Sequence, residues 1–143
     1  MSASEAAAIP VFAALKPRDR DRVLADATVR TYAPGATLVR EGEQSVFLYF
    51  IASGHALVST ASEGGLRTLG PGDFFGELGM IERHPRTATV VAEDEVTVVI
   101  VGAWEFRELL ETHPEMAVPM VFGLVSRLHG LVHDHADEDD APA

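Results

Sequence analysis

Apolar and polar positions follow two different spacings along this chain, one typical of helices and one typical of strands. Between residues 9 and 27, Val, Phe and Leu recur at three- and four-residue steps with a break at Pro17, which predicts two short helices, the second beginning at the proline. From residue 29 to residue 101, short runs rich in Val, Ile, Thr and aromatic residues alternate with turns, which predicts strands. The strands are expected at residues 29–32, 37–40, 47–51, 56–60, 66–69, 87–92 and 96–101.

Helical spacing returns after Gly102. One short helix is expected to end near His113, and a longer one to run over residues 114–133, where Met and Leu recur at three- and four-residue steps. Helices, then many strands, then two helices make an α+β domain. We expect an antiparallel β-roll, of the double-stranded β-helix or jelly-roll type, flanked by N-terminal helices and two C-terminal helices.

Composition and charge narrow this picture. The chain has 143 residues, 47% of them hydrophobic, no cysteine and a formal charge of −11, which suits one cytoplasmic globular domain and argues against non-specific nucleic-acid binding. No apolar run is long enough to cross a membrane. Residues 134–143 contain five acidic residues and no basic one, which predicts a disordered acidic tail after a single domain at residues 1–133.

Residues 72–90 interrupt the regular succession of short strands and turns. Gly76 and Gly79 allow close backbone approach to a ligand, and residues 76–81 are long enough for one helical turn whose free N–H groups would attract an anion. Arg86 would meet the same anion, and Glu77 would accept a hydrogen bond from a sugar hydroxyl. The residues alone allow two interpretations: a pocket for a phosphorylated sugar, or a surface turn with a Glu77–Arg86 salt bridge worth about 0–1 kcal/mol.

The sequence FGELGMI at residues 75–81, followed by RTATV at residues 86–90, resembles the phosphate-binding cassette of cyclic-nucleotide-binding domains. These domains occur in catabolite activator protein and in regulatory subunits of cyclic-nucleotide-dependent kinases. The likeness extends over roughly residues 11–133 and includes LGPGDF at residues 69–74. It implies a regulatory domain that binds cAMP, cGMP or both and signals by rearranging its C-terminal helices.

The resemblance also implies a role for each matching residue. Glu77 would take the ribose 2′-hydroxyl, and Arg86 would neutralise the cyclic phosphate beside the N–H groups of Gly76 and Leu78. Thr87 would touch the phosphate, and in members that prefer cGMP a threonine here also contacts guanine, so the choice of base stays open. The remaining expected site residues are Phe75, Gly79, Ala88 and Arg127, the last at a helix position where the family commonly has arginine.

Other functions remain as alternatives. The chain has no recognisable nucleophile–base pair, so we expect no enzyme. His129 and His133, with His135 nearby, have no acidic or cysteine partner at ligand spacing, so no metal is expected. Nothing basic follows His135, so DNA binding is not expected, and the effector is unknown. The rival function is a nucleotide-free interaction module on the same fold, and either function is compatible with a homodimer through the last helix.

Overall fold

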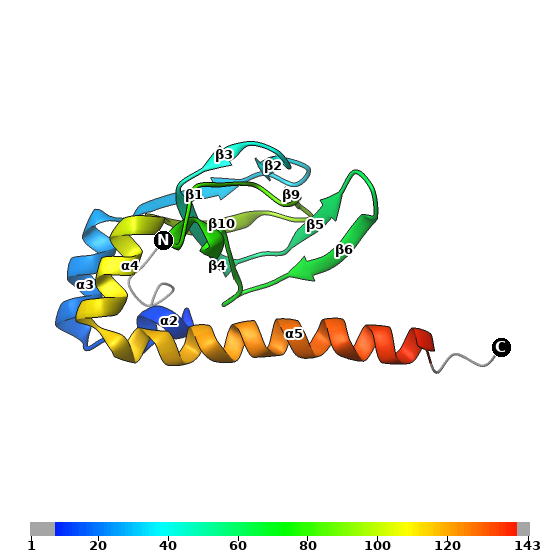
Figure 1. Ribbon diagram of the computed structural model, residues 1–143. Coiled ribbons are helices and arrows are strands. Elements are labelled where there is room, and N and C mark those ends of the chain that lie inside the picture. Colours follow the sequence, from blue (N-terminus) through cyan, green and yellow to red (C-terminus); the bar gives the residue numbers. More distant parts are fainter. Residues whose placement is uncertain (1–7, 140–143) are drawn as a thin grey trace.

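The computed structural model describes residues 8–139, with side chains for residues 8–130. It shows a β-roll with helices gathered at one end and one long helix running along its lower side (Figure 1). The helices are α2 (Pro10–Ala13), α3 (Pro17–Asp26), α4 (Ala103–Thr112) and α5 (Ala117–Asp139), with short 3₁₀ helices η1 (Glu77–Met80) and η2 (Pro114–Met116).

The roll consists of two four-stranded antiparallel sheets, ordered β1-β10-β4-β7 and β2-β9-β5-β6, and a small β3–β8 pair. The strands are β1 (Thr28–Tyr32), β2 (Thr37–Val39), β3 (Gln44–Ser45), β4 (Phe47–Ser53), β5 (Ala56–Thr60), β6 (Gly64–Leu69), β7 (Phe74–Phe75), β8 (His84–Pro85), β9 (Thr89–Ala92) and β10 (Val96–Gly102).

Two apolar clusters form the core, and strand β4 divides them. Its Ile51 belongs to the cluster inside the roll, whereas the neighbouring Phe50 belongs to the cluster between the roll and the helices. Successive side chains of a strand point to opposite faces, so β4 is buried on both sides. The ring of Phe50 meets those of Phe12 at 5.0 Å and Phe106 at 5.2 Å, which joins the N-terminal helices and α4 to the sheet.

The predicted order of elements is confirmed. All seven expected strands are present within one to two residues, and the break at Pro17 is confirmed because this proline is the first residue of α3. The three strands that were not predicted, β3, β7 and β8, have two residues each. Such short pairs carry no period that a sequence pattern can reveal.

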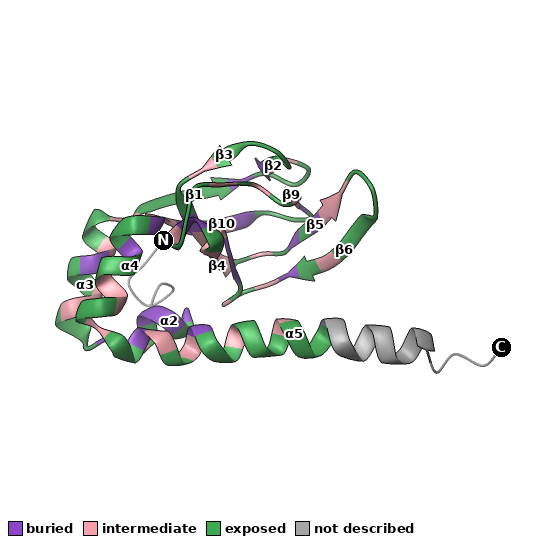
Figure 2. Cartoon of the chain, in the orientation of Figure 1, coloured by how far each residue is buried: buried purple, intermediate pink, exposed green. Residues whose placement is uncertain are grey.

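Helix α5 extends further than the helix expected at residues 114–133, since its backbone is helical through Asp139. The expected acidic tail at residues 134–143 stays a prediction. The chain has no glycine or proline between Gly130 and Pro142, so nothing stops the helix from propagating. Residues 140–143 lie outside the described part of the chain. Figure 2 shows that much of α5 is exposed, and no described helix is long and apolar enough to span a membrane.

Candidate functional site

The cassette begins with a left-handed turn at Gly76. Its φ of 95° is a conformation that side-chain-bearing residues rarely adopt. A Cβ atom here would lie 2.5 Å from Nη1 of Arg86 and 2.5 Å from the carbonyl oxygen of Phe47. Gly76 therefore serves two purposes: it turns the chain from β7 into η1, and it leaves room for Arg86 behind the turn.

Helix η1 rests on α4. A Cβ atom at Gly79 would lie 3.2 Å from Cβ of Ala103, the first residue of α4, so the close approach needs glycine. Nη1 of Arg107 donates a hydrogen bond to the carbonyl oxygen of Met80 at 3.2 Å. The cassette and α4 are thus in contact at the C-terminal end of η1, through Gly79 and Met80.

Arg86 lies half-buried in the roll, and one of its hydrogen-bond donors has no partner within residues 8–130. Its Nη2 donates to the carbonyl oxygen of Phe47 at 2.9 Å, and its guanidinium lies 5.4 Å from the ring centre of Tyr49 and 5.9 Å from that of Phe75. Its buried Nε has no hydrogen-bond partner among the described residues. Burial lowers the pKa of Arg86, and the nearby Tyr49 and Glu77 oppose that shift. An anion in the cavity would satisfy both the charge and the free donor.

Glu77 is paired with an arginine from the last helix. Nη1 of Arg127 lies 2.5 Å from Oε1 of Glu77, and Nη2 of Arg127 donates to the carbonyl oxygen of Phe74. Both charged side chains are about four-fifths buried, at 18% and 22% exposure. The interpretation of residues 72–90 as a surface turn with a Glu77–Arg86 salt bridge is therefore wrong: Glu77 pairs with Arg127, and Arg86 binds the Phe47 carbonyl.

A cavity of about 140 Å³ brings the predicted site residues together. All nine line it: Phe75, Gly76, Glu77, Leu78, Gly79, Arg86, Thr87, Ala88 and Arg127. It adjoins a larger open cavity of about 1110 Å³ between the roll and α5, and the two share five lining residues. The shared residues are Val58, Arg67, Thr87, Ala88 and Arg127. The geometry therefore offers a small polar pocket at the cassette and a wider, more apolar cavity between the roll and α5.

Arg67 is a site residue that the sequence reasoning missed. It lies on β6, lines both cavities and is half-buried. Burial and the charge of Arg127 lower its pKa, while Glu77 and Asp73 oppose this. The alternation of the strand could have indicated this. Arg67 lies two residues from the buried Leu69 and therefore on the same face, so the side chain of Arg67 points to the inner side of the roll.

The histidines of α5 give no metal site in the described part of the chain. The side chains of His133 and His135 lie outside the described residues, so a pair with His129 is not seen. Among the described residues, no group of three or more His, Asp or Glu side chains is placed to hold a metal ion.

Comparison with known proteins identifies the class of this domain. Residues 29–113, more than half of the chain, match the family model for the cyclic nucleotide-binding domain, and the chain belongs to that family. This confirms the resemblance drawn from the cassette.

The similar proteins include a kinase regulatory subunit, a potassium channel and a catabolite activator protein. The chain is 37% identical over 102 residues to the cAMP-dependent protein kinase regulatory subunit of Debaryomyces hansenii, covering 71% of this chain and 23% of that protein. It is 34% identical over 111 residues to a cyclic nucleotide-gated potassium channel of Mesorhizobium japonicum, covering 78% and 30%. The structure of Thermus thermophilus catabolite activator protein matches with a TM-score of 0.71 at 27% identity, covering 89% and 62%. The chain thus spans less than a third of the two curated relatives.

Proposed function

We propose that this chain is a cytoplasmic sensor domain that binds a cyclic nucleotide, cAMP or cGMP, in the cavity between the cassette and α5, and that it has no catalytic activity of its own. One observation carries the proposal: Glu77, Arg86 and Arg127 come from three separate elements and line the same cavity. The names of relatives in this family support cAMP as one ligand, since the Debaryomyces hansenii protein is a cAMP-dependent kinase regulator.

The chemistry of the cavity suggests how each group contributes. Arg86 has a free, buried Nε and would bind the cyclic phosphate by charge-assisted hydrogen bonds. The first N–H groups of a helical turn have no acceptor within that turn, and the residues at the start of η1, Gly76, Glu77 and Leu78, line the same cavity as Arg86. Glu77 would accept the ribose 2′-hydroxyl, and Thr87, which lines both cavities, stands between the phosphate pocket and the space for the base.

The ion pair between Glu77 and Arg127 supplies a route for the signal. A ribose hydroxyl that donates to Glu77 competes with Arg127 for the same carboxylate. The ligand therefore binds the two arrangements of α5 with different affinity, which is what shifting their populations requires. Rearrangement of α5 is accordingly the proposed output of nucleotide binding.

Calorimetry with cAMP and with cGMP tests this function. We expect saturable binding of at least one nucleotide, and we expect Arg86→Ala to weaken it by about 30-fold or more, since a buried charge contact is lost. Arg83→Ala is the matched control, because Arg83 is exposed on the other side of the two-residue strand β8 and has no ion-pair partner among the described residues. If folded protein binds neither nucleotide at millimolar concentration, the proposal is wrong.

A second candidate function is a nucleotide-free interaction or dimerisation module on the same fold. The exposed apolar side chains of α5 favour it: Val118, Val121, Phe122, Val125 and Leu128 are each more than half exposed. The free donor of Arg86 favours the sensor, because a module without ligand gains nothing from leaving the buried Nε of Arg86 without a hydrogen-bond partner.

A further inference from the structure

A groove of about 730 Å³ is lined by α3, α4 and the adjoining ends of β4 and β10. Three of its lining residues are large apolar side chains that remain exposed: Val46 at 40%, Phe47 at 48% and Trp104 at 51%. Helix α3 contributes little to cover them, since Val23 is its buried residue. Exposed aromatic side chains gathered in a concave surface are typical of protein interaction sites rather than of free solvent-facing surface.

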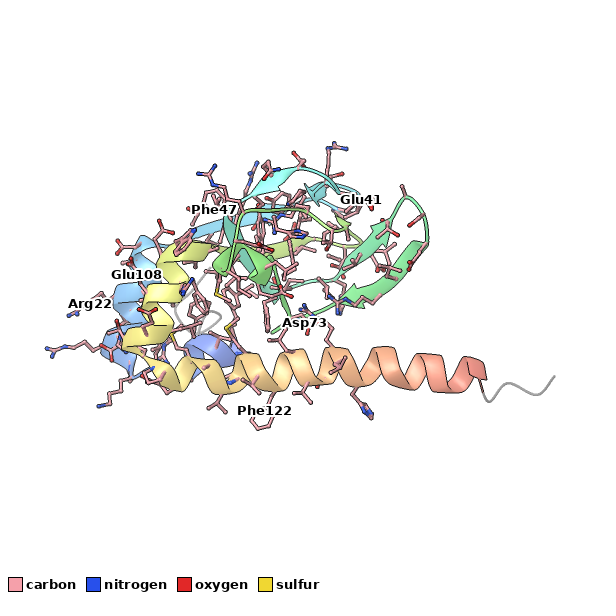
Figure 3. The ribbon with its side chains drawn as sticks, in the orientation of Figure 1. Arg22, Glu41, Phe47, Asp73, Glu108 and Phe122 are labelled. Carbon is pink, nitrogen blue, oxygen red and sulfur yellow. The ribbon has the colours of Figure 1, made fainter. Side chains whose placement is uncertain are left out.

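The rim of this groove is acidic. Four carboxylates line it, from Asp19, Asp26, Glu105 and Glu108, against the single arginine Arg22. Figure 3 shows Arg22 and Glu108 on the two helices and Phe47 at the end of the groove near the roll. Among the described residues, Asp26, Glu105 and Glu108 have no ion-pair partner, and Asp19 only approaches His113, at 3.9 Å.

The walls of the groove are also neighbours of the cassette. The carbonyl oxygen of Phe47, whose ring faces the groove, is the acceptor for Arg86. The carbonyl oxygen of Val46 accepts the N–H of Ala103 at 2.7 Å, where α4 begins and Gly79 packs. A change at Arg86 or η1 therefore reaches this groove through one hydrogen bond or one van der Waals contact.

We propose that this groove is a docking site for a basic amphipathic helix of a partner protein, and that it is an output surface of the domain. A helix laid against α3 and α4 would bury its apolar face on Phe47 and Trp104. Its Lys and Arg side chains would meet the unpaired carboxylates of Asp26, Glu105 and Glu108. Charge complementarity selects this occupant, because an acidic or neutral segment would leave those carboxylates unpaired or repelled.

Trp104 allows a direct test, because it is the only tryptophan of the chain and lies in the groove. The probe is a synthetic helical peptide of about 18 residues, five turns, with Leu on one face and Lys on the other, and without tryptophan. We expect saturable binding with a blue shift of the Trp104 fluorescence. A peptide with Glu in place of Lys should cause neither.

Charge reversal locates the binding. We expect the double variant Asp26→Lys, Glu108→Lys to bind the peptide at least about tenfold more weakly than the wild type. The matched control is Asp21→Lys with Glu95→Lys, which makes the same change in net charge at exposed residues that do not line the groove. Circular dichroism confirms that both variants fold. Equal weakening by both pairs would mean general attraction to an acidic protein, and no binding by the wild type would overturn the proposal outright.

Two further measurements separate the remaining outcomes. If light scattering shows that the groove variant dissociates a dimer, the occupant is a second copy of this chain and the proposal is overturned. The output role rests on the proposed nucleotide function: saturating cAMP should change the peptide dissociation constant by about fivefold or more. If calorimetry shows cAMP binding and the peptide affinity stays constant, the output role is wrong while the sensor function stands. If only cGMP binds, the same titration with saturating cGMP decides the output role. If neither nucleotide binds, the output role falls with the sensor function, and docking is judged from the nucleotide-free titration.

Discussion

Three arginines approach the cassette cavity from different elements: Arg67 from β6, Arg86 from the loop after β8 and Arg127 from α5. This gathering stands out in a chain with a formal charge of −11. Burial and, after it, the charge of Arg127 lower the pKa of Arg67, while Glu77 and Asp73 oppose this shift. An anionic ligand would offset the repulsion between the two arginines, which supports the proposed binding of a phosphate in this cavity.

Arg67 makes the choice of base testable. Guanine presents two acceptors, O6 and N7, to a guanidinium, whereas adenine presents N7 beside an amino donor. Arg67 lines both the cassette pocket and the cavity between the roll and α5. We therefore expect Arg67→Met to weaken the binding of cGMP by about tenfold more than the binding of cAMP. Calorimetry with both nucleotides measures this. An equal loss for the two would place Arg67 on the phosphate instead of the base.

Asp94 predicts a pH dependence outside the cavity. Its carboxylate accepts hydrogen bonds from the ring nitrogen of His55 at 2.8 Å and from the His55 amide at 2.6 Å, which lowers the pKa of Asp94 below its usual 3.8. A lowered pKa in the folded state means that the stabilisation is present above about pH 4 and is lost as the pH falls through the folded-state value. The difference in unfolding free energy between wild type and Asp94→Asn should therefore shrink below pH 4 in urea titrations. A difference that stays constant from pH 6 to pH 3 would contradict this.

At the scale of elements, α5 is the part whose position depends on single contacts. Met116 and Met120, in η2 and the first turn of α5, are buried in the core, but the helix beyond them is mostly exposed. Arg127 then ties it to the cassette through Glu77 and the Phe74 carbonyl, and its guanidinium lies 5.1 Å from the Phe74 ring centre. We therefore expect the first half of α5 to be held by the core and the second half to be released by a ligand that competes for Glu77.

Hydrogen exchange tests that anchor. We expect Arg127→Met to speed exchange of the α5 amides near and after residue 127 by about tenfold, the effect of losing ~1.4 kcal/mol of local stability. Arg107→Met is the matched control, because Arg107 also bonds a carbonyl of the cassette region but lies on α4 and is half-exposed. The expectation fails if α5 exchanges at the wild-type rate in Arg127→Met.

At the scale of the whole molecule, we expect a homodimer through the exposed apolar side chains of α5. Val118, Phe122 and Val125 follow one another at four- and three-residue steps and are each more than half exposed, and the first two also border the open cavity between the roll and α5. Figure 3 shows Phe122 pointing away from the roll. An apolar stripe of this kind on a long helix is typical of helix–helix association.

The dimer has a simple test. We expect light scattering to show a dimer for the wild type and a monomer for Val125→Glu, since a charge within the stripe would be buried in the dimer without a partner. Val29→Glu is the control, because Val29 is also exposed, at 42%, but lies on β1 far from the stripe. A monomeric wild type at every concentration would rule the dimer out.

Much of the site followed from local sequence. The cassette residues 75–79 and 86–88 lie within 14 positions of one another, and the glycines and charges that define them are recognisable without the fold. Arg67 and the true partner of Glu77 did not follow in this way. The Glu77–Arg127 pair joins residues 50 positions apart, and no periodic pattern reports which distant charge a carboxylate will meet.

The sequence by itself determined the order of helices and strands and the identity of the cassette, because helical and strand periods and turn-forming glycines act over a few neighbouring residues. Tertiary structure alone decided three things: that Arg67 lines the same cavity as Arg86 and Arg127, that Arg127 rather than Arg86 holds Glu77, and that α3 and α4 enclose an acidic, aromatic groove. Each depends on how the roll closes and where α5 and the helices pack against it. These are long-range contacts, set by the burial of the whole core rather than by any short stretch of the chain.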